Sequence, residues 1–326
     1  MPSRDLQVIR VFAGMTKLAV LCGQVRSKKG IKHEKLTSIM KNSTKPCVLC
    51  GNTRRSPLYS QDQWKVYRCD SCGLGVLDPR PDDAELAVLY QQDYFQSQYN
   101  QELLIDSSEM MRRLDQETQR LRFFRALKKQ GKVLDIGCGR GYFLLACRKK
   151  GYQVEGVDLS ADVAEYVRRE LSIPVHVGEI DGLEIPAGSF DVITMWHSLE
   201  HTADPNIYLQ KARGWLKEDG ILVVDVPNYA GHDATKTWDH WLGWQIPYHL
   251  YHFTSGSLKA MLNKHGFVIV RHKHFLSEYV KQKLESLYIP SFIARIIARF
   301  YSGHSYAVVA GKAAGNPSPN LREAGR

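Results

Sequence analysis

The chain has 326 residues, of which 44% are hydrophobic and 24% charged, a composition typical of a packed globular protein. This composition excludes wholesale disorder. The net charge is +10, but residues 1–46 hold ten Lys/Arg and two acidic residues and so carry +8 of it. The rest of the chain is close to neutral, so the positive charge does not indicate a fold built to bind nucleic acid.

Residues 1–44 are predicted to be a basic leader outside the fold. The apolar stretch from Val8 to Cys22 is interrupted by Arg10 and Lys17 and is shorter than the ~20 apolar residues of a membrane span. A transit peptide, a disordered arm and a gene start placed too early, with Met40 as the true start, all fit this segment. Whether residues 1–39 belong to the native protein stays open.

The chain has seven cysteines, and their spacing is not that of the disulfide framework of a small secreted domain. This favours a protein of the reducing cytoplasm.

Two Cys-x-x-Cys-Gly turns follow the leader, separated by eighteen residues. Two such turns can aim four thiolates at one ion, which favours a closed tetrahedral zinc site over four free thiols or a redox pair. A closed site has no open position for water, so the zinc is expected to be structural and to hold residues 45–80 as a small zinc ribbon. The predicted ligands are Cys47, Cys50, Cys69 and Cys72.

The Pro79-Arg80-Pro81 run marks a boundary, and residues 81–131 are predicted to be a helical lead-in, with one helix from Asp106 to Gln130. Beyond it, residues 132–312 alternate short apolar strands with amphipathic helices, which predicts a parallel sheet covered by helices on both faces. Residues 313–326 are expected to be a loose tail. Strands are predicted at 133–136, 154–158, 175–177, 190–196, 221–226, 267–270 and 306–309, and helices at 142–150, 161–171, 205–216 and 258–265.

A glycine-rich loop follows the first of these strands. Gly137, Gly139 and Gly141 stand at alternate positions, and the next helix begins directly after them. Such glycines let the backbone turn beneath a ligand, and the free amides of a helix start favour a carboxylate or phosphate. Asp158 closes the next strand, where a carboxylate can accept hydrogen bonds from ribose hydroxyls. Glycines that serve only the turn are the alternative.

These motifs together resemble class I S-adenosylmethionine-dependent methyltransferases. The resemblance rests on residues 133–141, Asp158, residues 189–193, 199–201, 216–220 and 226–228. With the cysteine pairs and Asp93-Tyr94-Phe95 in front, residues 45–312 resemble a bacterial branch of that family with an N-terminal zinc ribbon, which includes the deoxysugar C-methyltransferases. The implied fold is a Rossmann-like α/β fold with a seven-stranded sheet whose last strand runs antiparallel.

The resemblance also implies roles for individual residues. The three glycines would bracket the methionine moiety of S-adenosylmethionine, Asp135 would orient its amino group and Asp158 would hold its ribose. Further candidates for the cofactor are Glu179 and Ile180 beside the adenine, and Met195 and His197 beside the sulfonium.

An insertion at residues 229–253 is expected to cover the acceptor, because ligands bind beyond the carboxyl ends of parallel strands. It contains Trp238, Trp241 and Trp244, and seven of the twelve histidines lie between residues 232 and 274. The tryptophans serve either the acceptor or the packing of the loop. The candidate catalytic residues are His249, His252 and, on the acceptor side, Tyr94. His249 matches the histidine of the Glu-His pair in the sugar C-methyltransferases, but Tyr248 replaces the glutamate.

The expected function is methyl transfer from S-adenosylmethionine to a small molecule such as a sugar nucleotide, a glycolipid intermediate or a secondary metabolite, with a histidine as general base. Two alternatives remain: an rRNA methyltransferase that uses the ribbon to grip RNA, and a non-catalytic S-adenosylmethionine-binding protein. A nucleic-acid partner is not expected, because the fold is nearly neutral. The acceptor, the methylated atom and the oligomeric state stay open.

Residues 279–300 form a long amphipathic segment with many large apolar side chains. It is either a core helix or a helix that contacts a membrane surface or a lipid-bearing acceptor. We therefore expect a cytoplasmic protein that can bind peripherally at the inner face of the membrane.

Overall fold

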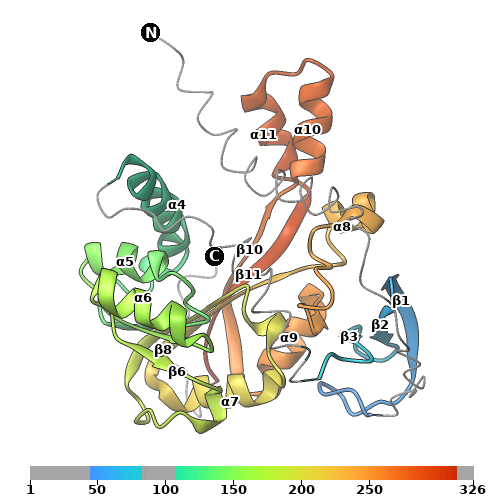
Figure 1. Cartoon of the computed structure of the whole chain (residues 1–326). Coiled ribbons are helices and arrows are strands. Elements are labelled where there is room, and N and C mark those ends of the chain that lie inside the picture. The colour runs from blue at the N-terminus through green and yellow to red at the C-terminus, as the bar shows by residue number, and fades with distance from the viewer. Residues whose placement is uncertain (1–44, 83–84, 86–106, 314–326) are drawn as a thin grey trace, which may run out of the picture. The chain divides into compact units, whose positions relative to one another are not determined.

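The computed structural model describes residues 45–82, 85 and 107–313 (Figure 1). The predictions for the leader, for Tyr94 and for residues 314–326 therefore lie outside the described residues. Residues 44–80 and 101–326 belong to one compact unit.

The larger sheet has seven strands in the order β10-β11-β8-β7-β4-β5-β6. Its central strands pair in parallel, whereas β11 pairs antiparallel with both β8 and β10. This arrangement confirms the predicted Rossmann-like α/β fold and its antiparallel last strand. The strands are β4 (Lys132–Ile136), β5 (Gln153–Asp158), β6 (Val175–Val177), β7 (Phe190–Trp196), β8 (Leu216–Pro227), β10 (Phe267–Leu276) and β11 (Ser302–Lys312).

Helices cover both faces of this sheet (Figure 1). Alternate strand residues point to opposite faces: Val133 packs with α4, α5 and α6, whereas Leu134 packs with α7 and α9. The predicted helices are present, and side chains of Ser107, Ser160 and Thr254 cap the first turns of α4, α6 and α9. Their bounds are α4 (Ser108–Arg125), α5 (Tyr142–Lys149), α6 (Ala161–Leu171), α7 (Pro205–Trp215) and α9 (Ser255–Lys264).

A second, four-stranded sheet joins the cysteine-bearing segment to the insertion. Its order is β1 (Arg55–Gln61), β2 (Trp64–Cys69), β3 (Gly75–Leu77) and β9 (Tyr251–His252). The two-residue strand β9 belongs to the insertion, which also contains α8 (His232–Thr237) and the 3-10 turn η5 (Trp238–His240). The sheet of the cysteine-bearing segment therefore takes its fourth strand, β9, from the insertion, which is distant in the sequence.

The long amphipathic segment forms two helices instead of one, α10 (Glu278–Ser286) and α11 (Ser291–Ala298). Pro290 stands at the N-cap of α11, and proline is suited to a helix start but not to a helix interior. None of the described helices has the length and apolar character needed to cross a membrane.

Candidate active site

The glycine loop turns sharply between β4 and α5. Gly137, Gly139 and Gly141 have φ angles of +77°, +50° and +70°, in the left-handed region that favours glycine. A Cβ atom added at Gly137 would lie 2.7 Å from the Cβ atom of Ser198. Both the backbone conformation and the space beneath the loop therefore require glycine at position 137.

Asp158 ends β5 beside this loop. Its Oδ2 atom accepts a hydrogen bond from the backbone amide of Gly139 at 2.9 Å, and Oδ1 accepts one from the amide of Ser160 at 3.0 Å. Burial raises the pKa of Asp158, while these amides act in the opposite direction. The side chain is only half-buried, and each carboxylate oxygen can accept a further hydrogen bond. The carboxylate is thus held at the rim of the loop and can still receive hydroxyl groups.

Asp135 lies deeper, at the end of β4. It is 3% exposed and accepts a hydrogen bond from the Thr194 hydroxyl at 2.5 Å. Burial raises its pKa to about 8, so the carboxyl group lacks a cationic partner strong enough to keep it charged. A ligand with an ammonium group would supply that partner, which fits the role expected for Asp135.

The other predicted cofactor residues lie at the same edge, because the carboxyl ends of parallel strands meet there. Glu179, exposed, and Ile180, buried, follow β6, where the amide of Gly178 donates to the Asp158 carbonyl at 3.2 Å. His197 follows β7. Met195, by contrast, is fully buried in the apolar core, and its contact with the sulfonium stays a prediction.

His197 is bracketed by two buried carboxylates. Its Nδ1 atom lies 3.3 Å from Glu200 Oε1, and its Nε2 atom lies 3.4 Å from Asp225 Oδ2. Burial disfavours the charged ring, but the charges of Asp225 and Glu200 prevail and raise the pKa of His197. Both contacts are longer than a typical N–H···O hydrogen bond, and the side chain is 30% exposed. The two carboxylates therefore hold the His197 ring in place, while its exposed part can still contact a ligand.

His249 and His252 are much less accessible, each 3% exposed. His249 Nδ1 lies 2.8 Å from the Gly243 carbonyl, which identifies Nδ1 as the protonated nitrogen. Burial lowers the pKa of His249 and lowers that of His252 to about 3. The role of His249 or His252 as a general base stays a prediction. With these lowered pKa values, both imidazole rings would be uncharged near neutral pH.

Glu200, His201 and His249 bring ligand atoms within 4.8 Å of one another. His201 Nδ1 contacts the Tyr248 carbonyl at 3.0 Å, so Nε2 is the nitrogen that each of the two imidazoles has left to bind a metal ion. The donor set is one that a divalent cation can use.

The ribbon packs directly on the insertion. The rings of Tyr59 and Trp244 stack with centroids 4.3 Å apart and planes within 3°. The Tyr229 hydroxyl donates to the Gly73 carbonyl, and the Leu77 amide donates to the Leu250 carbonyl at 3.0 Å. The ribbon therefore supports the segment that would cover an acceptor.

The four predicted cysteine ligands are brought together. Cys47 and Cys72 have sulfur atoms 3.5 Å apart, as do Cys50 and Cys69, and all four sulfurs lie within 4.8 Å of one another. Zn–S bonds of about 2.3 Å imply sulfur–sulfur distances of about 3.8 Å in a tetrahedron. The four thiols thus fit a closed zinc site.

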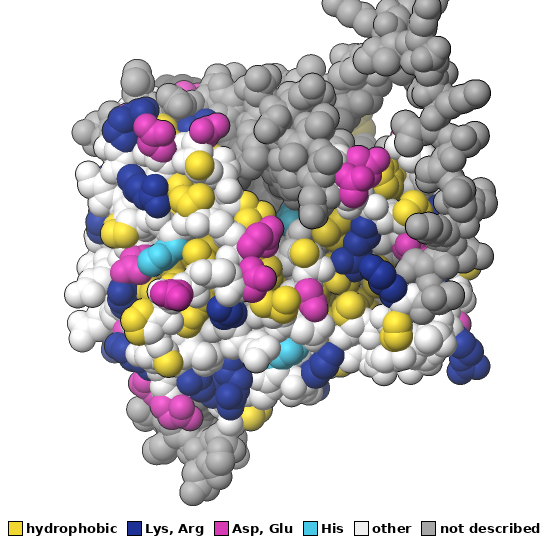
Figure 2. Space-filling model, turned by 60° about the horizontal axis from the view of Figure 1, so that its bottom comes forward, with side chains coloured by type: hydrophobic (Ala, Val, Ile, Leu, Met, Phe, Trp, Pro, Cys, Tyr) yellow, Lys and Arg dark blue, Asp and Glu magenta, His cyan; other side chains and the backbone are white. Residues whose placement is uncertain are grey.

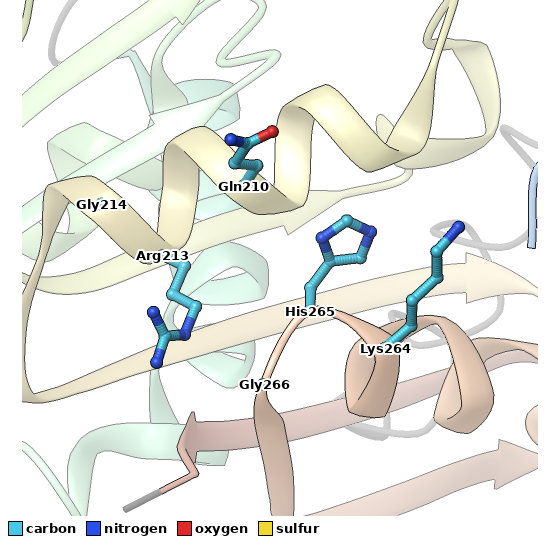
Figure 3. Close-up of a pocket in the computed structure, with 6 residues that line it drawn as sticks. All are labelled: Gln210, Arg213, Gly214, Lys264, His265 and Gly266. Atoms are coloured by element: carbon cyan, nitrogen blue, oxygen red, sulfur yellow. The ribbon is translucent and has the colours of Figure 1, made fainter.

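A hollow of about 520 Å³ lies elsewhere, between the end of α7 and the turn from α9 to β10 (Figure 3). It is lined by Arg213, Lys264 and His265 among others. These residues precede strands β8 and β10, whereas the glycine loop and His197 follow β4 and β7. The hollow is therefore at the opposite edge of the sheet from the candidate active site.

Three residues of the site were not found from the sequence: Thr194, Glu200 as a partner of His197, and Asp225. Asp225 gave a signal, because it stands alone among the valines of an apolar strand. A buried carboxylate in such a strand needs a partner, but the sequence could not show that the partner is His197.

The family model described as "Methyltransferase domain" matches residues 107–272, just over half of the chain. The chain belongs to this methyltransferase family. The matched residues include the glycine loop and Asp158. They also include the four histidines described above, His197, His201, His249 and His252, so the candidate active site lies within the methyltransferase domain. The cysteine-bearing segment lies outside the match.

Curated relatives include ubiquinone biosynthesis O-methyltransferases. The protein of that name from Actinobacillus pleuropneumoniae serotype 5b (strain L20) is 35% identical over 107 residues, covering 30% of this chain and 46% of that protein. The one from Coxiella burnetii (strain Dugway 5J108-111) is 33% identical over 101 residues, covering 29% and 43%. The chain thus spans less than half the length of these relatives.

Solved structures with a similar fold include a SAM-dependent methyltransferase from Archaeoglobus fulgidus, with 22% identity, a TM-score of 0.48 and coverage of 68% of this chain and 100% of that one. An S-adenosylmethionine-dependent methyltransferase from Mesorhizobium loti has 18% identity, a TM-score of 0.45 and coverage of 60% and 99%.

Proposed function

We propose that this chain transfers a methyl group from S-adenosylmethionine to a small-molecule acceptor. The observation that carries the proposal is the placement of Asp158 against the glycine loop, through the Gly139 amide at 2.9 Å. A nucleoside whose ribose hydroxyls bind Asp158 would have its amino-acid part over the loop, within reach of Asp135. S-adenosylmethionine, when bound there, supplies a methyl group on a positively charged sulfur.

A methyl group so held would be transferred in one in-line displacement, in which the acceptor atom would bond to the methyl carbon as the carbon–sulfur bond broke and its electron pair stayed on sulfur. The chain then has to align the acceptor and take its proton. We infer that His197 is the base. Its side chain is more exposed than those of His249 and His252, and either Asp225 or Glu200 can orient its ring while the other nitrogen serves the acceptor, as in Asp–His pairs.

The charge of the fold supports a small acceptor over RNA. Outside residues 1–46 the chain is nearly neutral, and Figure 2 shows acidic and basic side chains interspersed on the face that it presents. RNA recognition depends on concentrated positive charge. The ubiquinone O-methyltransferase relatives favour oxygen as the methylated atom, and the sequence resemblance to sugar C-methyltransferases favours carbon.

The test is to incubate the full chain with methyl-labelled S-adenosylmethionine and cell extract, and to find whether the label enters RNA, lipid or small solutes. We expect small solutes or lipid, with nuclease treatment releasing nothing. His197→Ala is expected to slow transfer by about 10²–10⁴-fold without loss of donor binding. Label in RNA would contradict the acceptor class, and a slow His249→Ala variant beside a normal His197→Ala variant would return the base to His249.

We also propose that Cys47, Cys50, Cys69 and Cys72 bind a structural zinc ion. The support is the approach of their four sulfurs and the small size of the ribbon, which has little apolar core of its own.

A further inference from the structure

Helix α11 presents its large apolar side chains to solvent. Ala294 and Ala298 form its buried face, whereas Phe292 is 65% exposed and Phe300, just beyond the helix, is 84% exposed. A surface helix of a globular protein normally has the opposite arrangement, with its large apolar side chains toward the core. The small residues allow close packing inside the protein, and the large ones are left without a partner in the described part of the chain.

The exposed apolar side chains form one concentrated patch. Of the twelve large apolar residues recorded as exposed in the described chain, seven lie between residues 287 and 301. A patch of this kind marks an interaction site, whereas single exposed apolar residues are ordinary. The members of this patch are Leu287, Tyr288, Phe292, Ile293, Ile296, Phe300 and Tyr301.

Positive charge accompanies the patch. Lys283, Arg295 and Arg299 have no recorded ion pair among the described residues, while the acid Glu278 is paired with Lys281. The strand that leads into the hairpin adds the exposed side chain of Lys273. Figure 1 shows α10 and α11 together beyond the ends of β10 and β11, so the patch and these charges belong to one projecting hairpin.

We propose that this hairpin, residues 278–301, docks on the surface of an anionic lipid bilayer. The apolar side chains would enter the boundary between headgroups and acyl chains, and the lysine and arginine side chains would meet the lipid phosphates. A second copy of the chain fits less well, because a symmetric contact through this patch would place the same unpaired cations opposite one another.

The test is sedimentation of the full chain with vesicles of phosphatidylcholine containing phosphatidylglycerol. The variant is Phe292→Ser/Phe300→Ser. The matched control is Met111→Ser/Val268→Ser, which removes two exposed apolar side chains, 48% and 52% exposed, outside the hairpin. Circular dichroism melting verifies that both variants fold, and the measurement requires neither methyl transfer nor donor binding.

We expect the parent and the control to bind the vesicles, and the Phe variant to bind at least about tenfold more weakly. Lys283→Gln/Arg299→Gln is expected to weaken binding by about fivefold per charge on anionic vesicles only. Because residues 1–46 are also basic, equal binding by the parent and the Phe variant would assign the contact to that segment and overturn the proposal. Failure of the parent to bind, or a parent dimer that the Phe variant converts to a monomer, would overturn it as well.

Discussion

At the scale of single residues, the site is formed by polar groups that are fixed by neighbours distant in sequence. Asp158 and the glycines could be predicted, because a strand, a turn and a helix in sequence determine where they lie. The His197–Asp225 contact could not, because it depends on the parallel pairing of β7 and β8, in which Trp196 lies opposite Asp225. Periodicity identifies strands, but it does not say which side chains meet at their ends.

Asp191 allows a test of the electrostatics at the opposite edge of the sheet. Its Oδ2 atom accepts hydrogen bonds from Lys217 Nζ and from the Lys132 amide, each at 2.8 Å. These contacts outweigh burial and lower the pKa of Asp191. Its contribution to stability is therefore complete above the unfolded pKa of about 3.9 and is lost as the pH falls through the lower folded pKa.

We expect Asp191→Asn to lower the free energy of unfolding by about 1 kcal/mol at pH 7, since Lys217 is partly exposed and the pair is screened. Urea unfolding of the parent and the variant at pH 7 and near pH 3.5 measures this. The difference should shrink at the lower pH, and a difference that grows on acidification would contradict the assigned sign.

At the scale of elements, the ribbon and the insertion depend on each other. The cysteine spacing predicted the ligand set, but nothing in a two-residue strand such as β9 could predict its pairing with β3, since so short an element has no detectable period. The 279–300 segment was predicted as one helix, so its break at Pro290 was missed although proline is a known helix breaker. The outward direction of Phe292 and Ile296 depends on how α11 packs and could not be predicted from the sequence.

Loss of the four-cysteine site should affect the acceptor side and spare the donor side. We expect one zinc per chain in the parent by elemental analysis, and close to none in Cys47→Ser/Cys72→Ser. Because β3 holds β9, this variant should lose methyl transfer while its affinity for S-adenosylmethionine changes by less than about threefold. Cys147→Ala, outside the cluster, should keep its zinc. A parent isolated under reducing conditions without zinc would contradict the assignment.

At the scale of the whole molecule, the parallel sheet directs the ends of β4, β5, β6 and β7 to one edge, where the glycine loop, Asp158 and His197 meet. The alternation of strands and helices predicted the order of this sheet's strands and helices, because each element has its own apolar pattern. The predicted lengths of β8, β10 and β11 were about half of the observed ones or less. The hollow between α7 and the turn from α9 to β10 lies at the other edge, so the topology of the sheet, and not this hollow, locates the candidate active site.

The glycine loop and Asp158 are expected to bind S-adenosylmethionine. Equilibrium dialysis with labelled S-adenosylmethionine tests this binding directly on the parent and Asp158→Ala, with Asp181→Ala, an exposed acid after β6, as the matched control. We predict one site per chain in the parent and the control, and an affinity at least about tenfold weaker in Asp158→Ala, since a carboxylate that binds two hydroxyls is lost. Equal affinities in Asp158→Ala and the parent would contradict the account.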